Sequence, residues 1–232
     1  MTSGGQHSGG GQPKLASFED KLKSANRNEG ILSWQGEPGN SKRVPDDPDS
    51  ALAKALAECG VDGIVYKDGD VDFTPVSKFD VKFNDFDGLY AFLGETISIG
   101  SLKTRGDLRN RIRSRWQALA KNQLVDRINS DPEFAADIAG RTGIDISGGK
   151  MTSTRLSEEL SRVGLTLHET PDCGVIQFVP TLIHEKFRHL GGVAEMSERA
   201  LSGDLMERIR TVLSTDDATR KRSLFSEVLS KI

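Results

Sequence analysis

The longest regular pattern of apolar positions in the chain covers residues 102–128. Apolar side chains recur there near the spacing of an amphipathic helix, in which they share one face. The pattern predicts a helix longer than any other in the chain. Its apolar members are Leu108, Ile112, Trp116, Leu119 and Ile128.

Shorter helical patterns cover residues 18–25, 49–59 and 152–163. A further helix is predicted from Asp131-Pro132. Aspartate there can accept hydrogen bonds from the free amides of a helix N-terminus, and proline suits the first helical position.

Strand patterns occur in two parts of the chain. In residues 64–73, two apolar runs flank a Lys-Asp-Gly turn and predict a hairpin, and residues 79–83 predict another strand. Further along, residues 164–168 and 175–179 predict two strands joined by a turn, and a helix can begin at Pro180. The fold class predicted is α+β, mainly helical by count.

The two ends of the chain differ from the middle. Residues 1–12 are rich in glycine, serine and glutamine, a composition that buries no core. We expect residues 1–28 to form a disordered linker or tail. Residues 197–232 predict a helical extension.

The composition limits the classes of protein to which this chain can belong. Hydrophobic residues make up 36% and charged residues 28%, so a packed core is expected over only part of the chain. The formal net charge is -3, whereas a wholly non-specific nucleic-acid binder is usually basic. No apolar run approaches the roughly 18 residues of a spanning helix, and the N-terminus lacks the pattern of a signal peptide.

One segment is strongly basic, although the chain as a whole has a negative net charge. Residues 105–127 contain seven basic and two acidic residues, so the long predicted helix has a basic face. Such a face is often merely solvated, but it could bind a phosphate backbone without sequence preference. The candidate nucleic-acid-binding residues are Arg109, Arg113 and Lys121.

Three of the four histidines fall within one stretch, at His168, His184 and His189, and Glu169 follows the first. A hairpin backed by a helix can bring the end of its first strand beside the first turns of the helix. His189 lies five residues after His184, about 140° around a regular helix. It can therefore join the site only if the helix ends first, and the glycine pair that follows Leu190 supplies a stop.

This set of side chains suits metal-assisted phosphodiester hydrolysis. A general base activates water, and a divalent ion (Mg²⁺, Mn²⁺ or Zn²⁺) neutralises charge on the phosphate. Neutral His168 suits the base, while Glu169, His184 and His189 suit metal binding. Because His168 and Glu169 are adjacent, their roles could be exchanged.

The motifs LTLHE (165–169), QFVP (177–180) and HLGG (189–192), with His184 between the last two, resemble those of His-Asn-His/endonuclease VII nucleases, the ββα-metal or His-Me finger superfamily. The similarity is to modules of bacterial polymorphic toxins with Trp-His-His or His-Glu motifs. The upstream segments SWQGEPGNSKRVP (33–45) and GVDGIVYKDGDVDFTPVS (60–77) are also similar to segments that often precede this motif. Two departures are Leu167, where tryptophan is usual, and Pro38, where arginine is usual.

The resemblance implies a toxin-type nuclease domain over residues 29–196, with a ββα-metal core at 164–190 and an α/β segment before it. It implies a metal-dependent endonuclease that acts on nucleic acid, DNA more than RNA. It also implies an antibacterial effector, made in the bacterial cytoplasm and secreted or delivered into a target cell, with a cognate immunity protein. The resemblance does not extend to residues 197–232.

Two alternatives stay open at this point. A structural metal site would more often use cysteine, and only Cys173 lies nearby. A catalytically retired ββα-metal fold could bind nucleic acid or protein without cutting. The complete histidine set favours the enzyme, because a retired one has no chemical need for all three.

Overall fold

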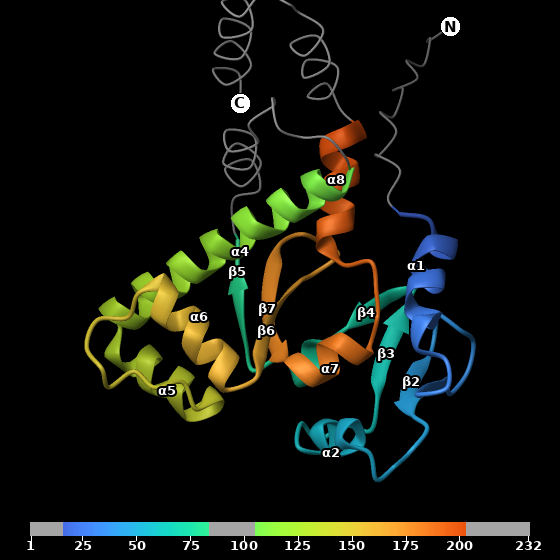
Figure 1. Ribbon diagram of the computed structural model, residues 1–232, viewed down its shortest axis with the longest axis horizontal. Coiled ribbons are helices and arrows are strands. Elements are labelled where there is room, and N and C mark those ends of the chain that lie inside the picture. The colour runs from blue at the N-terminus through green and yellow to red at the C-terminus, as the bar shows by residue number, and fades with distance from the viewer. Residues whose placement is uncertain (1–15, 84–104, 203–232) are drawn as a thin grey trace, which may run out of the picture.

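The computed structural model describes residues 16–83 and 105–202, and the predicted tail at residues 1–12 and most of the C-terminal extension lie outside them. The described chain is α+β, as predicted, with two antiparallel sheets and helices around them (Figure 1). None of the described helices has the length and apolar character needed to cross a membrane.

The first sheet is built from the N-terminal third of the chain in the order β1-β2-β3-β4. The two-residue hairpin loop between β3 and β4 is Asp68-Gly69, and both residues have positive φ (52° and 79°), as a tight hairpin turn requires. The elements of this part are α1 (Phe18–Ala25), η1 (Asn26–Asn28), β1 (Leu32–Trp34), β2 (Lys42–Pro45), α2 (Ala51–Ala57), β3 (Ile64–Lys67), β4 (Asp70–Asp72) and η2 (Thr74–Val76).

The second sheet has the order β5-β7-β6, so β7 pairs with strands on both sides. β5 (Phe79–Lys82) joins from far earlier in the sequence, with Phe79 opposite Phe178. β6 (Leu165–Glu169) and β7 (Val175–Pro180) form the predicted hairpin, with His168 opposite Gln177.

Five helices surround this sheet in the described residues. The long predicted helix is α4 (Arg105–Ser130). Two of the other helices begin at the residues where the sequence predicts a helix start: the Asp131 side chain caps α5, and the Thr152 side chain caps α6. The others are α5 (Pro132–Thr142), α6 (Ser153–Arg162), α7 (Thr181–Lys186) and α8 (Gly192–Ser202).

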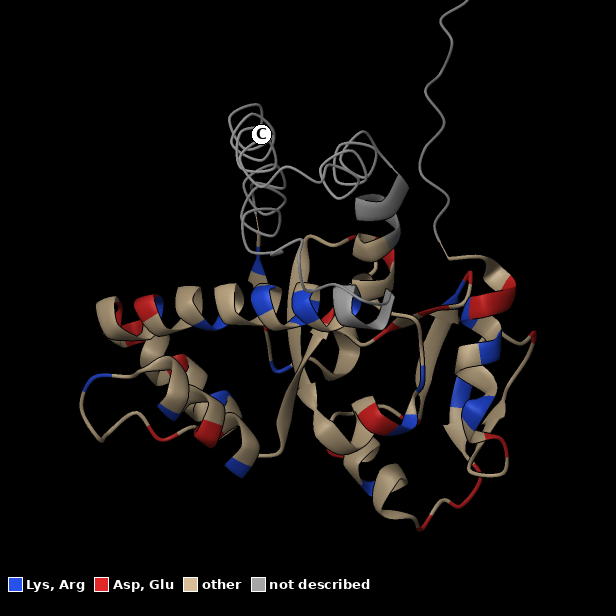
Figure 2. Ribbon diagram, turned by 45° about the horizontal axis from the view of Figure 1, so that its top comes forward, with Lys and Arg blue, Asp and Glu red and all other residues tan. Residues whose placement is uncertain are grey.

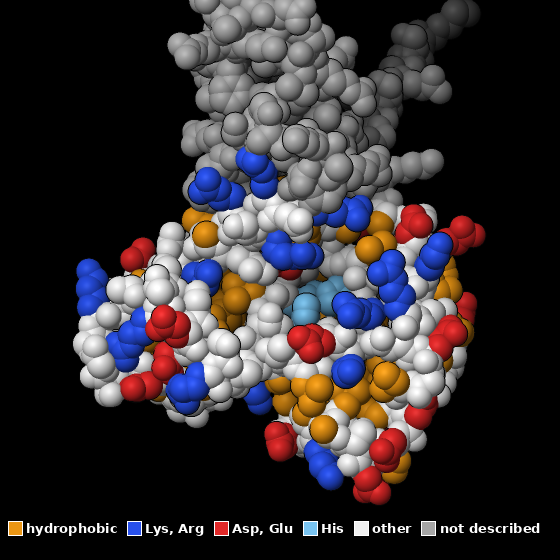
Figure 3. Space-filling view, viewed as in Figure 1, with side chains coloured by type: hydrophobic (Ala, Val, Ile, Leu, Met, Phe, Trp, Pro, Cys, Tyr) orange, Lys and Arg blue, Asp and Glu red, His pale blue; other side chains and the backbone are white. Residues whose placement is uncertain are grey.

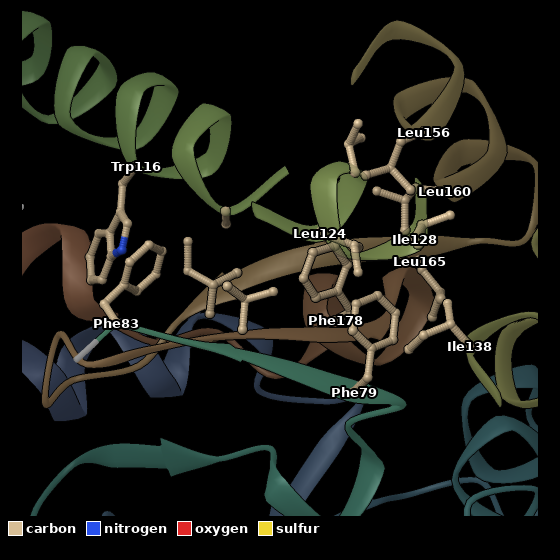
Figure 4. Close-up of a cluster of buried hydrophobic side chains, with 14 of the residues drawn as sticks. Phe79, Phe83, Trp116, Leu124, Ile128, Ile138, Leu156, Leu160, Leu165 and Phe178 are labelled. Carbon is tan, nitrogen blue, oxygen red and sulfur yellow. The ribbon is translucent and has the colours of Figure 1, made fainter. Parts of the chain in front are cut away.

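Two hydrophobic cores meet at β7. The first lies between α4, α5, α6 and the second sheet, where Trp116 and Leu124 of α4 face Phe83 and Phe178 (Figure 4). The second core lies beneath the first sheet and takes Val179 from β7 and Ile183 from α7. The β6–β7–α7 unit is therefore packed on both sides.

Helix α1 shows that the predicted disordered tail does not extend over all of residues 1–28. It falls within residues 1–28, but its Lys21 and Ala25 side chains are buried. The Lys21 ammonium lies 2.7 Å from the Asp70 carboxylate and 3.2 Å from that of Glu195 in α8. Residues from α1 onward thus belong to the folded domain.

Candidate metal centre

The site is built by the β6–β7–α7 unit, the strand, turn, strand and helix that the sequence predicted. His168 and Glu169 are the last two residues of β6, and His184 lies in α7. Helix α7 ends at Lys186, and Phe187 leaves the helical conformation with φ -87° and ψ 82°. The early end of this helix releases His189 to turn back toward the other two histidines.

Two glycines allow that return. A side chain at Gly192 would collide with the carbonyl oxygen of Thr170, and one at Gly191 would crowd the carbonyl oxygen of Glu169. The chain after α7 therefore packs directly against the end of β6. This close approach explains why glycine follows Leu190 at both positions of the His-Leu-Gly-Gly sequence.

His168, His184 and His189 form one cluster. One potential ligand nitrogen from each lies within 4.8 Å of those of the other two. Their ring centroids are 4.7 to 5.5 Å apart. The predicted convergence of the three histidines is therefore present.

The histidines are held as neutral imidazoles. Burial lowers the pKa of His168 well below its usual value, and the neighbouring histidines lower it further. Burial also lowers the pKa of His184 to about 3 and that of His189 to about 4. Neutral imidazole is the form that binds metal ions.

The hydrogen bonds of the cluster leave ring nitrogens of His168 and His189 free to bind a metal ion. His189 Nδ1 lies 2.9 Å from the carbonyl oxygen of Phe187, which can only accept, so Nδ1 carries the proton and Nε2 the free lone pair. Neither ring nitrogen of buried His168 has a hydrogen-bond partner among the described residues. Buried polar atoms are normally paired, so this arrangement fits an ion that the three imidazoles would hold together.

Glu169 faces other partners. Its carboxylate accepts a hydrogen bond of 2.8 Å from Gln117 Nε2 and lies 3.9 Å from Arg113 Nε, both on α4. Burial raises its pKa, and Arg113 and Gln117 oppose that shift. Among the described residues, the group of side chains that could hold an ion consists of the three histidines and does not include Glu169.

The cluster opens into a hollow of about 390 Å³. His184, His189 and Glu169 line it, together with basic residues that could attract a phosphate. Those basic residues are Arg109 and Arg113 of α4, and Arg188. Figure 3 shows the histidines at the bottom of the hollow with basic side chains around it, and Figure 2 shows basic positions along α4.

The predicted basic residues are divided between two places. Arg109 and Arg113 line the hollow of the histidines, whereas Lys121 lines a neighbouring pocket and donates a 3.0 Å hydrogen bond to Ser157 Oγ. Gln117 was not predicted, although it lies four residues from Arg113 and so shares its face of α4.

The first sheet supports the cluster in a way that no sequence pattern indicated. Phe73, fully buried just after β4, contacts all three histidine rings at centroid distances of 4.8 to 5.6 Å. Tyr66 of β3 donates a 3.0 Å hydrogen bond to the carbonyl of Arg188. Asn28 donates another, of 2.5 Å, to the carbonyl of Lys186. These contacts fix the segment between α7 and His189.

Comparison with known proteins agrees with this geometry. A profile of the DNase/tRNase domain of colicin-like bacteriocins matches residues 63–191, more than half of the chain, from the start of β3 to the end of the His-Leu-Gly segment. No curated protein and no solved structure matched in the corresponding searches. The matched family has nucleic acid as its substrate and a colicin-type immunity protein as its partner. The chain belongs to the colicin-like bacteriocin DNase/tRNase domain family and is a toxin nuclease domain.

Proposed function

We propose that the domain is a divalent-metal-dependent endonuclease of the His-Asn-His/endonuclease VII type, with DNA as the favoured substrate. The observation that carries the proposal is the trio of neutral histidines, two of which, His184 and His189, line an arginine-bordered hollow. Structural zinc sites usually have four protein ligands, whereas catalytic sites keep three and leave a position open. A group of three histidines beside an open hollow fits the catalytic type.

His168, His184 and His189 would hold the ion. A bound divalent ion supplies charge neutralisation at the phosphate and at the leaving oxygen. Glu169 takes the proton of the attacking water, because its carboxylate faces the same hollow and is not needed in the histidine group. Of the two assignments that the sequence left open, this arrangement favours His168 as the ligand and Glu169 as the base.

The arginines around the hollow position the substrate. Arg113 lies beside Glu169 and projects from a helix whose next turns also border the hollow, so it can orient a phosphate close to the base. Arg109 and Arg188 add positive charge at the rim. The domain would act in a target cell after secretion or delivery, while an immunity protein protects the producer.

The test combines cleavage with metal removal. Plasmid DNA and total RNA are incubated with the full chain and Mg²⁺, Mn²⁺ or Zn²⁺, with and without EDTA. We expect cleavage with at least one metal, loss of cleavage in EDTA, and loss in His184→Ala. Lys54→Ala, an exposed change on α2, is the matched control.

Three outcomes would overturn parts of the proposal. Failure of the wild type to cut either substrate with any metal removes the enzyme function. Cleavage that survives in His184→Ala removes the histidine site. Cleavage of RNA alone replaces DNA with RNA as the substrate.

A further inference from the structure

Helix α4 borders two adjacent pockets. Arg109, Arg113 and Gln117 are spaced four residues apart and line the histidine hollow, and Lys121, another four residues on, lines the second pocket. Four residues advance a helix by about 6 Å, so these side chains form a slowly winding row. The row leads away from the metal centre and ends at the positively charged Lys121.

The opposite wall of both pockets is β6. Thr166 and Leu167 line the two pockets in common, Gly164 and Leu165 line only the second, and Glu169 only the first. The two spaces are therefore consecutive sections of one groove that runs between α4 and β6. Figure 3 shows an apolar patch in the hollow between α6 and the histidines, where this second section lies.

The second pocket has the chemistry of a nucleotide site. Its volume is about 310 Å³. Four hydroxyl-bearing residues and three leucines line it: Ser157, Ser161, Thr166 and Thr181, with Leu160, Leu165 and Leu167. Such a lining can contact a sugar or base through its apolar part and a phosphate through its polar part.

Lys121 supplies the charge for that phosphate. Its ammonium donates to the neutral hydroxyl of Ser157, and no carboxylate forms an ion pair with it among the described residues. An ammonium that is not neutralised locally contributes directly to phosphate affinity.

We propose that the second pocket binds the nucleotide adjacent to the scissile phosphate, with Lys121 on the neighbouring phosphate. The inference rests on the proposed nuclease function. It gives the substrate strand a path from the histidine hollow along α4 toward α6.

Two measurements test the pocket, and the first does not require catalysis. The salt dependence of binding to a fluorescent single-stranded oligonucleotide is measured in EDTA for the wild type, Lys121→Ala and Lys54→Ala. Loss of one phosphate contact should weaken binding about five- to tenfold and reduce the salt slope by about one. We expect this change in Lys121→Ala and not in Lys54→Ala.

The second measurement is cleavage of oligothymidylates that contain one, two or three phosphates. We expect kcat/KM of the wild type to rise sharply when the second phosphate is added, and this rise to shrink in Lys121→Ala. Ser161→Phe, which fills the pocket from an exposed position without changing charge, should shrink it too. Thermal unfolding of each variant verifies that it is folded.

The results separate the two proposals. An unchanged salt slope in Lys121→Ala, or a second-phosphate effect that persists in both Lys121→Ala and Ser161→Phe, overturns the pocket even if the enzyme cuts DNA. A wild type that binds with the expected slope but cuts nothing overturns the nuclease mechanism and leaves the binding groove.

Discussion

Glu169 and His168 are neighbours in sequence with different surroundings. His168 is packed among two imidazoles and Phe73, while Glu169 meets Gln117 and Arg113. The two side chains leave β6 in different directions, but the Glu169 carboxylate lines the same hollow as His184 and His189. His168 can therefore hold the ion while Glu169 acts on the attacking water.

The first prediction concerns that division of roles. Glu169→Gln keeps the size and the hydrogen-bonding capacity of the side chain but removes its ability to take a proton. We expect cleavage to fall about 100-fold or more, while zinc affinity by calorimetry changes little. Glu185→Gln, an exposed carboxylate at the same hollow, is the control. Full activity in Glu169→Gln would return the role of base to another group.

The second prediction concerns the stability of the metal-free protein as pH falls. The folded protein keeps His184 and His189 neutral with pKa values of about 3 and 4, whereas an unfolded histidine takes up a proton near pH 6.5. Between those values the unfolded state binds more protons, so the free energy of unfolding falls as pH decreases below about 6.5.

Urea unfolding in EDTA at pH 7.5, 6.0 and 5.0 measures this effect. We expect a progressive fall in the midpoint, and a smaller fall in His184→Gln because one titrating group is gone. Equal midpoints at the three pH values would contradict the buried neutral cluster.

At this scale the sequence predicted that His184 and His189 lie close together, but not which of His168 and Glu169 joins them. The density of histidines in one stretch indicated a centre, and the glycines after Leu190 indicated the helix end. Whether His168 or Glu169 joins the cluster depends on which face of β6 lies against α4, a contact with a segment about fifty residues earlier, and no local pattern encodes that.

At the scale of elements, the segment between α7 and His189 depends on its neighbours in the first sheet. Tyr66→Phe removes one hydrogen bond and leaves the Arg188 carbonyl without it. We expect a loss of about 1 kcal/mol in the free energy of unfolding. We also expect weaker zinc binding, because His189 is less firmly positioned.

Thermal unfolding and zinc titration measure the two effects. Ser33→Ala, which removes an exposed hydroxyl contact to Asp46, provides the comparison. A variant Tyr66→Phe that loses stability but keeps wild-type zinc affinity would limit Tyr66 to a purely structural role.

Most elements could be predicted because their signals are local. Asp131 and Thr152 mark helix starts through their own side chains, and Asp68-Gly69 marks the hairpin. The pairing of β5 with β7 joins segments almost a hundred residues apart, and the sequence offered only two apolar runs for it. Helix α1 was recognised as a short helix, but its burial was not.

At the scale of the whole molecule, Lys21 connects the N-terminal helix to β4 and α8. Lys21→Met leaves Glu195, which is 1% exposed, without its cation. Breaking a buried pair from one side costs about 3–5 kcal/mol, so we expect a loss of that size in urea unfolding. Lys23→Met, an exposed change on the same helix, should have little effect.

The double variant Lys21→Met/Glu195→Gln completes this test. Removing the stranded charge should recover part of the lost stability, since the buried carboxylate no longer needs a partner. No recovery would indicate that the loss comes from packing of α1 and not from the ion pair.

The contacts that close the metal centre join residues far apart in the sequence. Tyr66 and Arg188 are separated by 122 positions, and Asn28 and Lys186 by 158. Chains emerge from the ribosome N-terminal end first, and contacts of long sequence separation form late in folding. A growing chain therefore presents the first sheet well before it has three histidines to bring together. On the proposed mechanism, the hazard to the cell that makes this toxin begins only when synthesis has passed His189, so the immunity protein must be present by then.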